Sequence, residues 1–108
     1  MTGTARRGLN EQQKDEIKRE LARRLGDEPE VRRLVVFGSF LHSENPHDID
    51  LAVFQDSNES YLPLALKYRR RIRDVLHRIA VDVIPIRPDP PDVEFLDEIE
   101  KGEVIYER

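Results

Sequence analysis

Cysteine is absent from the 108 residues of this chain. A disulfide framework, thiolate chemistry and a zinc site built on cysteine are therefore excluded. Long apolar runs are absent as well, because the first thirty residues hold no stretch of signal-peptide length. No segment approaches the roughly 18 apolar residues of a membrane span. We therefore expect a soluble, cytoplasmic protein, although a chain without cysteine would also suit an oxidising compartment.

An excess of positive charge is also lacking, since the net charge is -4 although 37% of the residues are charged. This balance argues against a general nucleic-acid binder that acts by neutralising phosphates. The length suits one domain with its own apolar core. We expect residues 1–8, which are small, polar and basic, to be disordered, and residues 9–108 to form that domain.

The apolar residues alternate between helical and strand-like patterns along the chain. This order predicts an α/β (α+β) protein with a small three- to four-stranded mixed sheet packed by helices. We expect helices over residues 11–25, from residue 61 to about 79, and over residues 95–101. Strands are expected at residues 34–37, at residues 48–54, at residues 80–86 and at residues 104–106. Pro88, Pro90 and Pro91 predict a stiff extended link before the last helix.

Local signals mark the ends of these elements. Asn10 and Gln13 form a capping-box pattern before the first helix, and Gly26 stands where a left-handed C-cap belongs. Pro63 fits the first turn of the second helix, and Pro85 suggests that the third strand lies at an edge. The predicted buried stripe of the second helix is Tyr61, Ala65, Tyr68, Ile72, Val75 and Ile79. Its arginines, at positions 69–71, 73 and 78, predict a solvated face, with binding of an acidic partner or of nucleic acid as the alternative.

The most informative stretch is the second strand, which opens with Asp48-Ile49-Asp50. Alternate residues of a strand share a face, so Asp48 and Asp50 project together, about 6.6 Å apart. Two adjacent carboxylates on an otherwise apolar strand repel each other and resist desolvation. A divalent cation is the simplest reason for them, and a solvated strand end is the alternative.

Two further groups belong with this pair. Asp82 is the one charged residue of residues 80–86, and it would join the pair if its strand lies beside the Asp-x-Asp strand. Otherwise it is a surface residue on an edge. Gly38 and Ser39 end the first strand, where they form either a plain turn or a seat for an anion. His42 and His47 lie in the connecting loop, where we expect them to be solvated.

Together these residues resemble a known family. Phe-Gly-Ser at residues 37–39, Asp-Ile-Asp-Leu-Ala-Val at 48–53 and Val-Asp-Val at 81–83 are similar to the motifs of the minimal nucleotidyltransferases of the DNA polymerase beta-like superfamily. The final ten residues, Ile-Glu-Lys-Gly-Glu-Val-Ile-Tyr-Glu-Arg, fit that family too. The spacer from Phe40 to His47 holds eight residues, which is shorter than is common in small members. Phe40 and Leu41 stand where many members carry Arg and Gly.

The resemblance implies a function. Gly38 and Ser39 would hold the triphosphate of an NTP, with ATP as the favoured nucleotide. Asp48 and Asp50 would bind two Mg²⁺ (or Mn²⁺) ions. Asp82 would bind the catalytic metal and help to activate the acceptor hydroxyl. A nucleoside monophosphate would move to that hydroxyl, and pyrophosphate would leave.

The resemblance also implies partners, because stand-alone proteins of this kind often accompany a helical HEPN protein in a toxin–antitoxin pair. A homodimer would be another way to complete a site on so small a chain. The alternative to an enzyme is a catalytically weak nucleotidyltransferase-like module that binds and neutralises a partner. A nucleic-acid binder would show steep salt dependence, and the net charge disfavours it.

Overall fold

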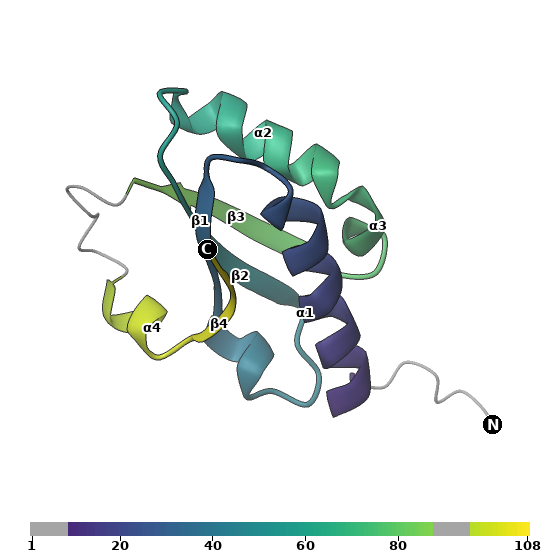
Figure 1. Ribbon diagram of the computed structural model, residues 1–108. Coiled ribbons are helices and arrows are strands. Elements are labelled where there is room, and N and C mark those ends of the chain that lie inside the picture. The colour runs from purple at the N-terminus through teal and green to yellow at the C-terminus, as the bar shows by residue number, and fades with distance from the viewer. Residues whose placement is uncertain (1–8, 88–95) are drawn as a thin grey trace.

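The computed structural model describes residues 9–87 and 96–108, which form a four-stranded mixed sheet with helices on both faces (Figure 1). The predicted fold class is confirmed. The elements in chain order are α1 (Glu11–Gly26), β1 (Val31–Phe37), the 3-10 helix η2 (Gly38–Leu41), β2 (Asp48–Gln55), α2 (Tyr61–Arg71), α3 (Arg73–Leu76), β3 (Ala80–Ile86), α4 (Leu96–Glu100) and β4 (Glu103–Glu107). Within these ranges no helix has the length and apolar character needed to cross a membrane.

Some predictions fall outside the described residues. These are the disordered N-terminus at residues 1–8, the extended link with Pro88, Pro90 and Pro91, and Phe95, the expected first residue of the last helix.

The strand order in the sheet is β3-β2-β1-β4. β1 is antiparallel to both β2 and β4, whereas β2 and β3 are parallel. Parallel strands need a long crossover connection, and α2 and α3 form the one between β2 and β3. β3 is an edge strand, as Pro85 predicted.

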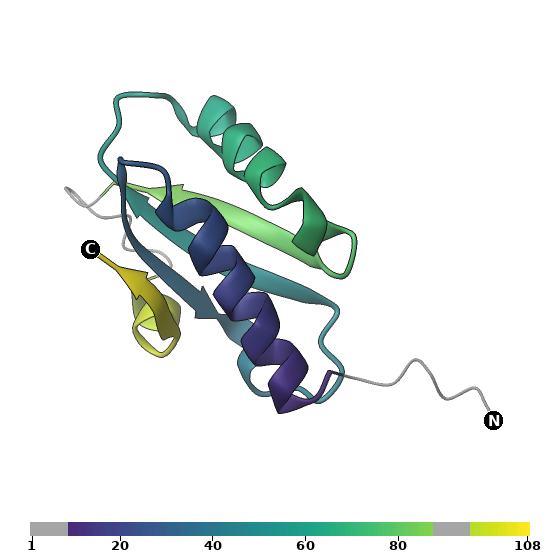
Figure 2. The same cartoon turned by 45° about the vertical axis from the view of Figure 1, so that its right-hand side comes forward.

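The two faces of the sheet bury apolar clusters of different size. The larger cluster packs α1, α2 and α3 against residues such as Leu34, Ile49 and Leu51. The smaller one lies beneath α4 and includes Phe37, Phe54 and Ile99. Figure 2 shows α1 and α2 together on one side of the sheet and α4 on the other. The central strands β1 and β2 therefore alternate between two interiors, which explains the unbroken apolar run of residues 34–37.

β1 begins at Val31, earlier than predicted. Arg32 and Arg33 interrupt the apolar pattern, so the sequence did not indicate that the strand begins before Leu34. The guanidinium of Arg33 lies over the ring of Phe54, 4.3 Å from its centroid, so its charge is accommodated on the strand.

The start of α1 is as predicted, but its end is not. The Asn10 side chain accepts from the Gln13 amide at 2.8 Å, and the Gln13 side chain accepts from the Asn10 amide at 2.9 Å. Gly26, however, is the last helical residue, followed by a right-handed Asp27, so the left-handed C-cap prediction is wrong. A Cβ on Gly26 would come within 2.8 Å of the Tyr106 ring. The close approach of β4 is therefore what favours glycine here.

The predicted long second helix is also wrong, because it is interrupted at Ile72. Ile72 has φ -107° and ψ 26°, which separates α2 from α3. The buried stripe contains Leu64, Ala65, Tyr68, Ile72 and Val75, and not Tyr61, which is 56% exposed. The interruption lets α3 turn toward β3 while Ile72 stays fully buried.

Candidate active site

The parallel pairing of β2 and β3 brings two aspartates together. Asp50 is the register partner of Asp82, and Asp48 is opposite Ala80. Paired residues on neighbouring strands point to the same face of a sheet. All three aspartates therefore lie on the face opposite Ile49, Leu51 and Val83, which are buried in the larger cluster. Asp48 and Asp50 are half-buried, and Asp82 is exposed.

The Gly-Ser turn lies against the same aspartates. Phe37, the last residue of β1, pairs with Asp50, and Gly38 follows with a φ of +84°. A Cβ on Gly38 would collide with Oδ2 of Asp50. η2 begins at this glycine, and the carbonyl of Ser39 accepts from the amides of His42 at 3.0 Å and Ser43 at 2.8 Å. Ser39, which directly follows this glycine, is exposed.

The charges in this region are of one sign. Burial, followed by the neighbouring charges of Asp48 and Asp82, raises the pKa of the Asp50 carboxyl, and a hydrogen bond with Asp82 adds to the effect. Among the described residues, no Lys, Arg or His forms an ion pair with any of the three aspartates. Such a cluster is stabilised when a cation binds to it.

The donor set fits a hard divalent cation, since it consists of carboxylate oxygens. The three carboxylates are only partly in the arrangement that a shared cation would need. Within the part of the chain that the structure describes, no three acidic or histidine side chains are already gathered around one point. Asp50 and Asp82 are paired, whereas Asp48 is two residues along β2 on the same face. Binding by all three would require a change of side-chain rotamer.

His42 and His47 are exposed in the loop between η2 and β2, as predicted.

An open groove of about 470 Å³ lies on the other face of the sheet, between α1 and α3. Its lining includes Glu20 and Arg23, which are already paired at 2.8 Å, and it is remote from the aspartates.

Sequence reasoning missed one buried residue beside the Gly-Ser turn. Lys14 is 4% exposed, although lysine is ordinarily a surface residue. Its signal was spacing, because Lys14 precedes Ile17, Leu21 and Leu25 at intervals of three, four and four residues along the buried stripe.

Residues 16–108 match the family described as Polymerase beta, Nucleotidyltransferase. The chain belongs to this family, and the prediction of a minimal nucleotidyltransferase is confirmed. Among solved structures, it resembles a chain from the crystal structure of the toxin-antitoxin MntA-HepT, with a TM-score of 0.62 and 14% sequence identity. The match covers 87% of this chain and 73% of that chain, and it shows a shared fold. No curated protein of similar sequence is found.

Proposed function

We propose that this chain is an enzyme that transfers a nucleoside monophosphate from an NTP, with ATP as the first candidate, to an acceptor hydroxyl. Membership of the nucleotidyltransferase family supports the reaction class. The observation that carries the proposal is the pairing of Asp50 with Asp82 directly beside Gly38. A carboxylate cluster without an ion-pair partner among the described residues, next to a glycine turn, suits a metal-bound triphosphate.

Each residue has a proposed role. Gly38 allows the triphosphate to approach the backbone closely, and Ser39 offers a hydroxyl to it. Asp48, Asp50 and Asp82 would hold Mg²⁺ or Mn²⁺. These cations, when bound, would neutralise the triphosphate and the charge that develops at phosphorus. The acceptor oxygen bonds to the α-phosphorus, the bond from that phosphorus to pyrophosphate breaks, and Asp82 takes the hydroxyl proton.

A second candidate is a binding module with little turnover that neutralises a helical HEPN-type partner. The eight-residue spacer and the incompletely gathered carboxylates favour it. The similar fold of a chain from a toxin-antitoxin complex supports this kind of partner. The two candidates differ in whether Asp50 is needed.

The test is thermal unfolding with Mg²⁺ and each of the four NTPs, for the wild type and for Asp50→Asn. A ligand at a hundred times its Kd stabilises the folded state by about 2.7 kcal/mol. Each 1 kcal/mol raises Tm by about 4–8 °C for a domain of this size. We therefore expect a rise of about 10 °C or more with the preferred nucleotide, only with Mg²⁺ and only in the wild type.

Asp56→Asn is the matched control, because Asp56 follows the other end of β2 and pairs with Arg32. It should show the same nucleotide-dependent rise as the wild type. Transfer is then followed by mass spectrometry of the candidate acceptor, as a gain of one nucleoside monophosphate. An equal rise in Asp50→Asn would refute the proposed site, and nucleotide binding without transfer would favour the second candidate.

A further inference from the structure

A buried lysine lies behind the Gly-Ser turn. Lys14 is on α1 and only 4% exposed, and burial of a lysine is expensive unless its ammonium is hydrogen-bonded. Its Nζ donates to the carbonyl of Ser43 at 2.7 Å. The same Nζ lies 5.5 Å from the centroid of the Phe40 ring, within the range of a cation–π contact. No acidic side chain of the described residues pairs with it.

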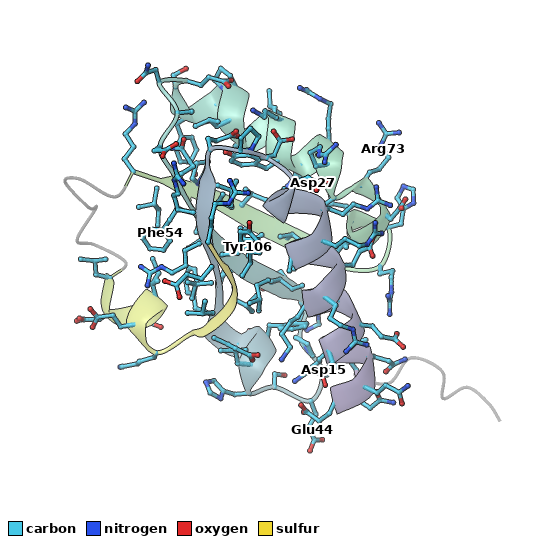
Figure 3. The ribbon with its side chains drawn as sticks, in the orientation of Figure 1. Asp15, Asp27, Glu44, Phe54, Arg73 and Tyr106 are labelled. Carbon is cyan, nitrogen blue, oxygen red and sulfur yellow. The ribbon has the colours of Figure 1, made fainter. Side chains whose placement is uncertain are left out.

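These contacts connect α1 to the peptide group of Ser39. The Ser43 amide donates to the Ser39 carbonyl at 2.8 Å, and the Ser43 carbonyl accepts from Lys14. Ser43 Oγ also accepts from the amide of Asn45 at 3.0 Å, which fixes the first half of the loop. Figure 3 shows Glu44 of this loop at the same end of the molecule as Asp15 of α1.

The turn therefore has two sides with different surroundings. On one side, the Asp50 carboxylate occupies the space that a Cβ on Gly38 would need. On the other side, Phe40 is 1% exposed and packs in the larger cluster beneath α1. Lys14 acts on this second side, through Phe40 and Ser43, and among the described residues it forms no hydrogen bond or ion pair with the aspartates.

We propose that Lys14 is a positioning residue that holds the Gly38–Leu41 turn in the geometry that receives the triphosphate. This inference rests on the proposed function. The spacer between Ser39 and Asp48 has eight residues. The Lys14 ammonium connects the middle of this spacer to α1 through its hydrogen bond to Ser43. Without the Lys14 ammonium, the Ser43 carbonyl loses its hydrogen-bond donor. The loop that carries the His42 and Ser43 amides, which donate to the Ser39 carbonyl, is then less firmly held.

The test uses Lys14→Met, which keeps an apolar stem and removes the ammonium. Lys18→Met is the matched control, because Lys18 lies one turn further along α1 and pairs with Asp15 and Glu103. Lys14→Arg should restore function, since it retains the charge and the donors. If Lys14→Met does not fold, Lys14→Gln replaces it, because it keeps an amide donor without the charge.

Two readouts are needed. Hydrogen exchange of the His42 and Ser43 amides should be faster in Lys14→Met by about tenfold or more, as loss of a hydrogen bond to a charged group implies. The Kd for Mg²⁺–ATP should weaken by about the same factor while the free energy of unfolding stays close to that of Lys18→Met. A residue with a merely structural role would not change the nucleotide affinity at temperatures where the chain is folded.

Unchanged exchange at His42 and Ser43 in Lys14→Met overturns the inference. Faster exchange with unchanged nucleotide affinity overturns it too, because the turn would then not need this support. If the wild type binds none of the NTPs, the proposed function fails, and the exchange data still decide whether Lys14 holds the turn.

Discussion

Gly38 meets two separate requirements, one of its backbone and one of its surroundings. Its φ of +84° lies in the left-handed region, and it is the one described residue with a positive φ. Oδ2 of Asp50 occupies the space that a Cβ would need. Backbone strain and side-chain collision therefore both select glycine at this position. The neighbouring Ser39 has neither constraint, since it is exposed.

We expect Gly38→Ala to lower the free energy of unfolding by at least about 1–2 kcal/mol, the strain of an L-residue in the left-handed region. It should also displace the Asp50 carboxylate and abolish Mg²⁺-dependent nucleotide binding. Urea unfolding and calorimetric titration with Mg²⁺–ATP measure the two effects.

Ser39→Ala is the control, and its free energy of unfolding should stay within about 0.5 kcal/mol of the wild type. A stable Gly38→Ala that still binds nucleotide would mean that Asp50 does not need its observed position.

At the scale of elements, the α2–α3 segment shows that tertiary packing, and not helical spacing alone, decides which residues are buried. A single continuous helix predicts Tyr61 on the buried stripe, but Tyr61, the first residue of α2, is exposed. Ile72 is fully buried, whereas Leu66 on α2 is 48% exposed. Two aliphatic residues of similar size thus have opposite environments on neighbouring turns.

We expect Ile72→Ala to reduce the free energy of unfolding by about 2–5 kcal/mol, as for other buried aliphatic residues cut to alanine. Leu66→Ala should change it by about 0.5 kcal/mol or less. Urea unfolding followed by circular dichroism distinguishes them. Equal losses in the two variants would contradict the buried position of Ile72 and the exposed position of Leu66.

At the scale of the whole molecule, a cluster of charges joins the start of β1 to α2. Nζ of Lys67 lies 3.0 Å from Glu30 Oε2, and the hydroxyl of Tyr68 donates to the same oxygen at 2.8 Å. Burial raises the pKa of Glu30, but the hydrogen bonds from Tyr68 and Lys67 outweigh it and lower the pKa overall. The hydrogen bond to Glu30 raises the pKa of Lys67. Both shifts favour the charged pair in the folded state.

Because of this cluster, the free energy of unfolding should fall both at acid pH and at alkaline pH. The Glu30 contribution is present above its ordinary pKa of 4.5 and is lost as the pH falls through its lowered folded value. The Lys67 contribution is present below 10.5 and is lost as the pH rises through its raised value. We expect Glu30→Gln to lose about 1–3 kcal/mol at neutral pH, with the difference from wild type vanishing in acid.

Urea unfolding at a series of pH values provides the measurement. Glu59→Gln is the control, because the Glu59 carboxylate is 48% exposed and 3.5 Å from Lys67. It should lose about 1 kcal/mol or less at any pH. A Glu30→Gln deficit that persists unchanged at low pH would show that the lost stability does not come from the charge.

Much of the fold could be predicted because its signals are local. The capping box at Asn10, the alternation along β2 and the bounds of β3 follow from backbone periods of 3.6 and 2, which neighbouring residues alone set. The same alternation placed Asp48 and Asp50 on one face. The Gly38-Ser39 corner and the Asp-x-Asp pair could therefore be proposed as a candidate site before any strand order was known.

The remaining features were decided by tertiary structure, since they depend on residues far apart in the chain. Asp82 joins Asp50 only because α2 and α3 return β3 parallel to β2. Gly26 faces the Tyr106 ring, and Lys14 reaches Ser43, across separations of 80 and 29 residues. No local period encodes such contacts, because they arise from the packing of the whole core. The sequence by itself therefore determined the elements and the candidate ligands, and tertiary packing decided which of those residues meet.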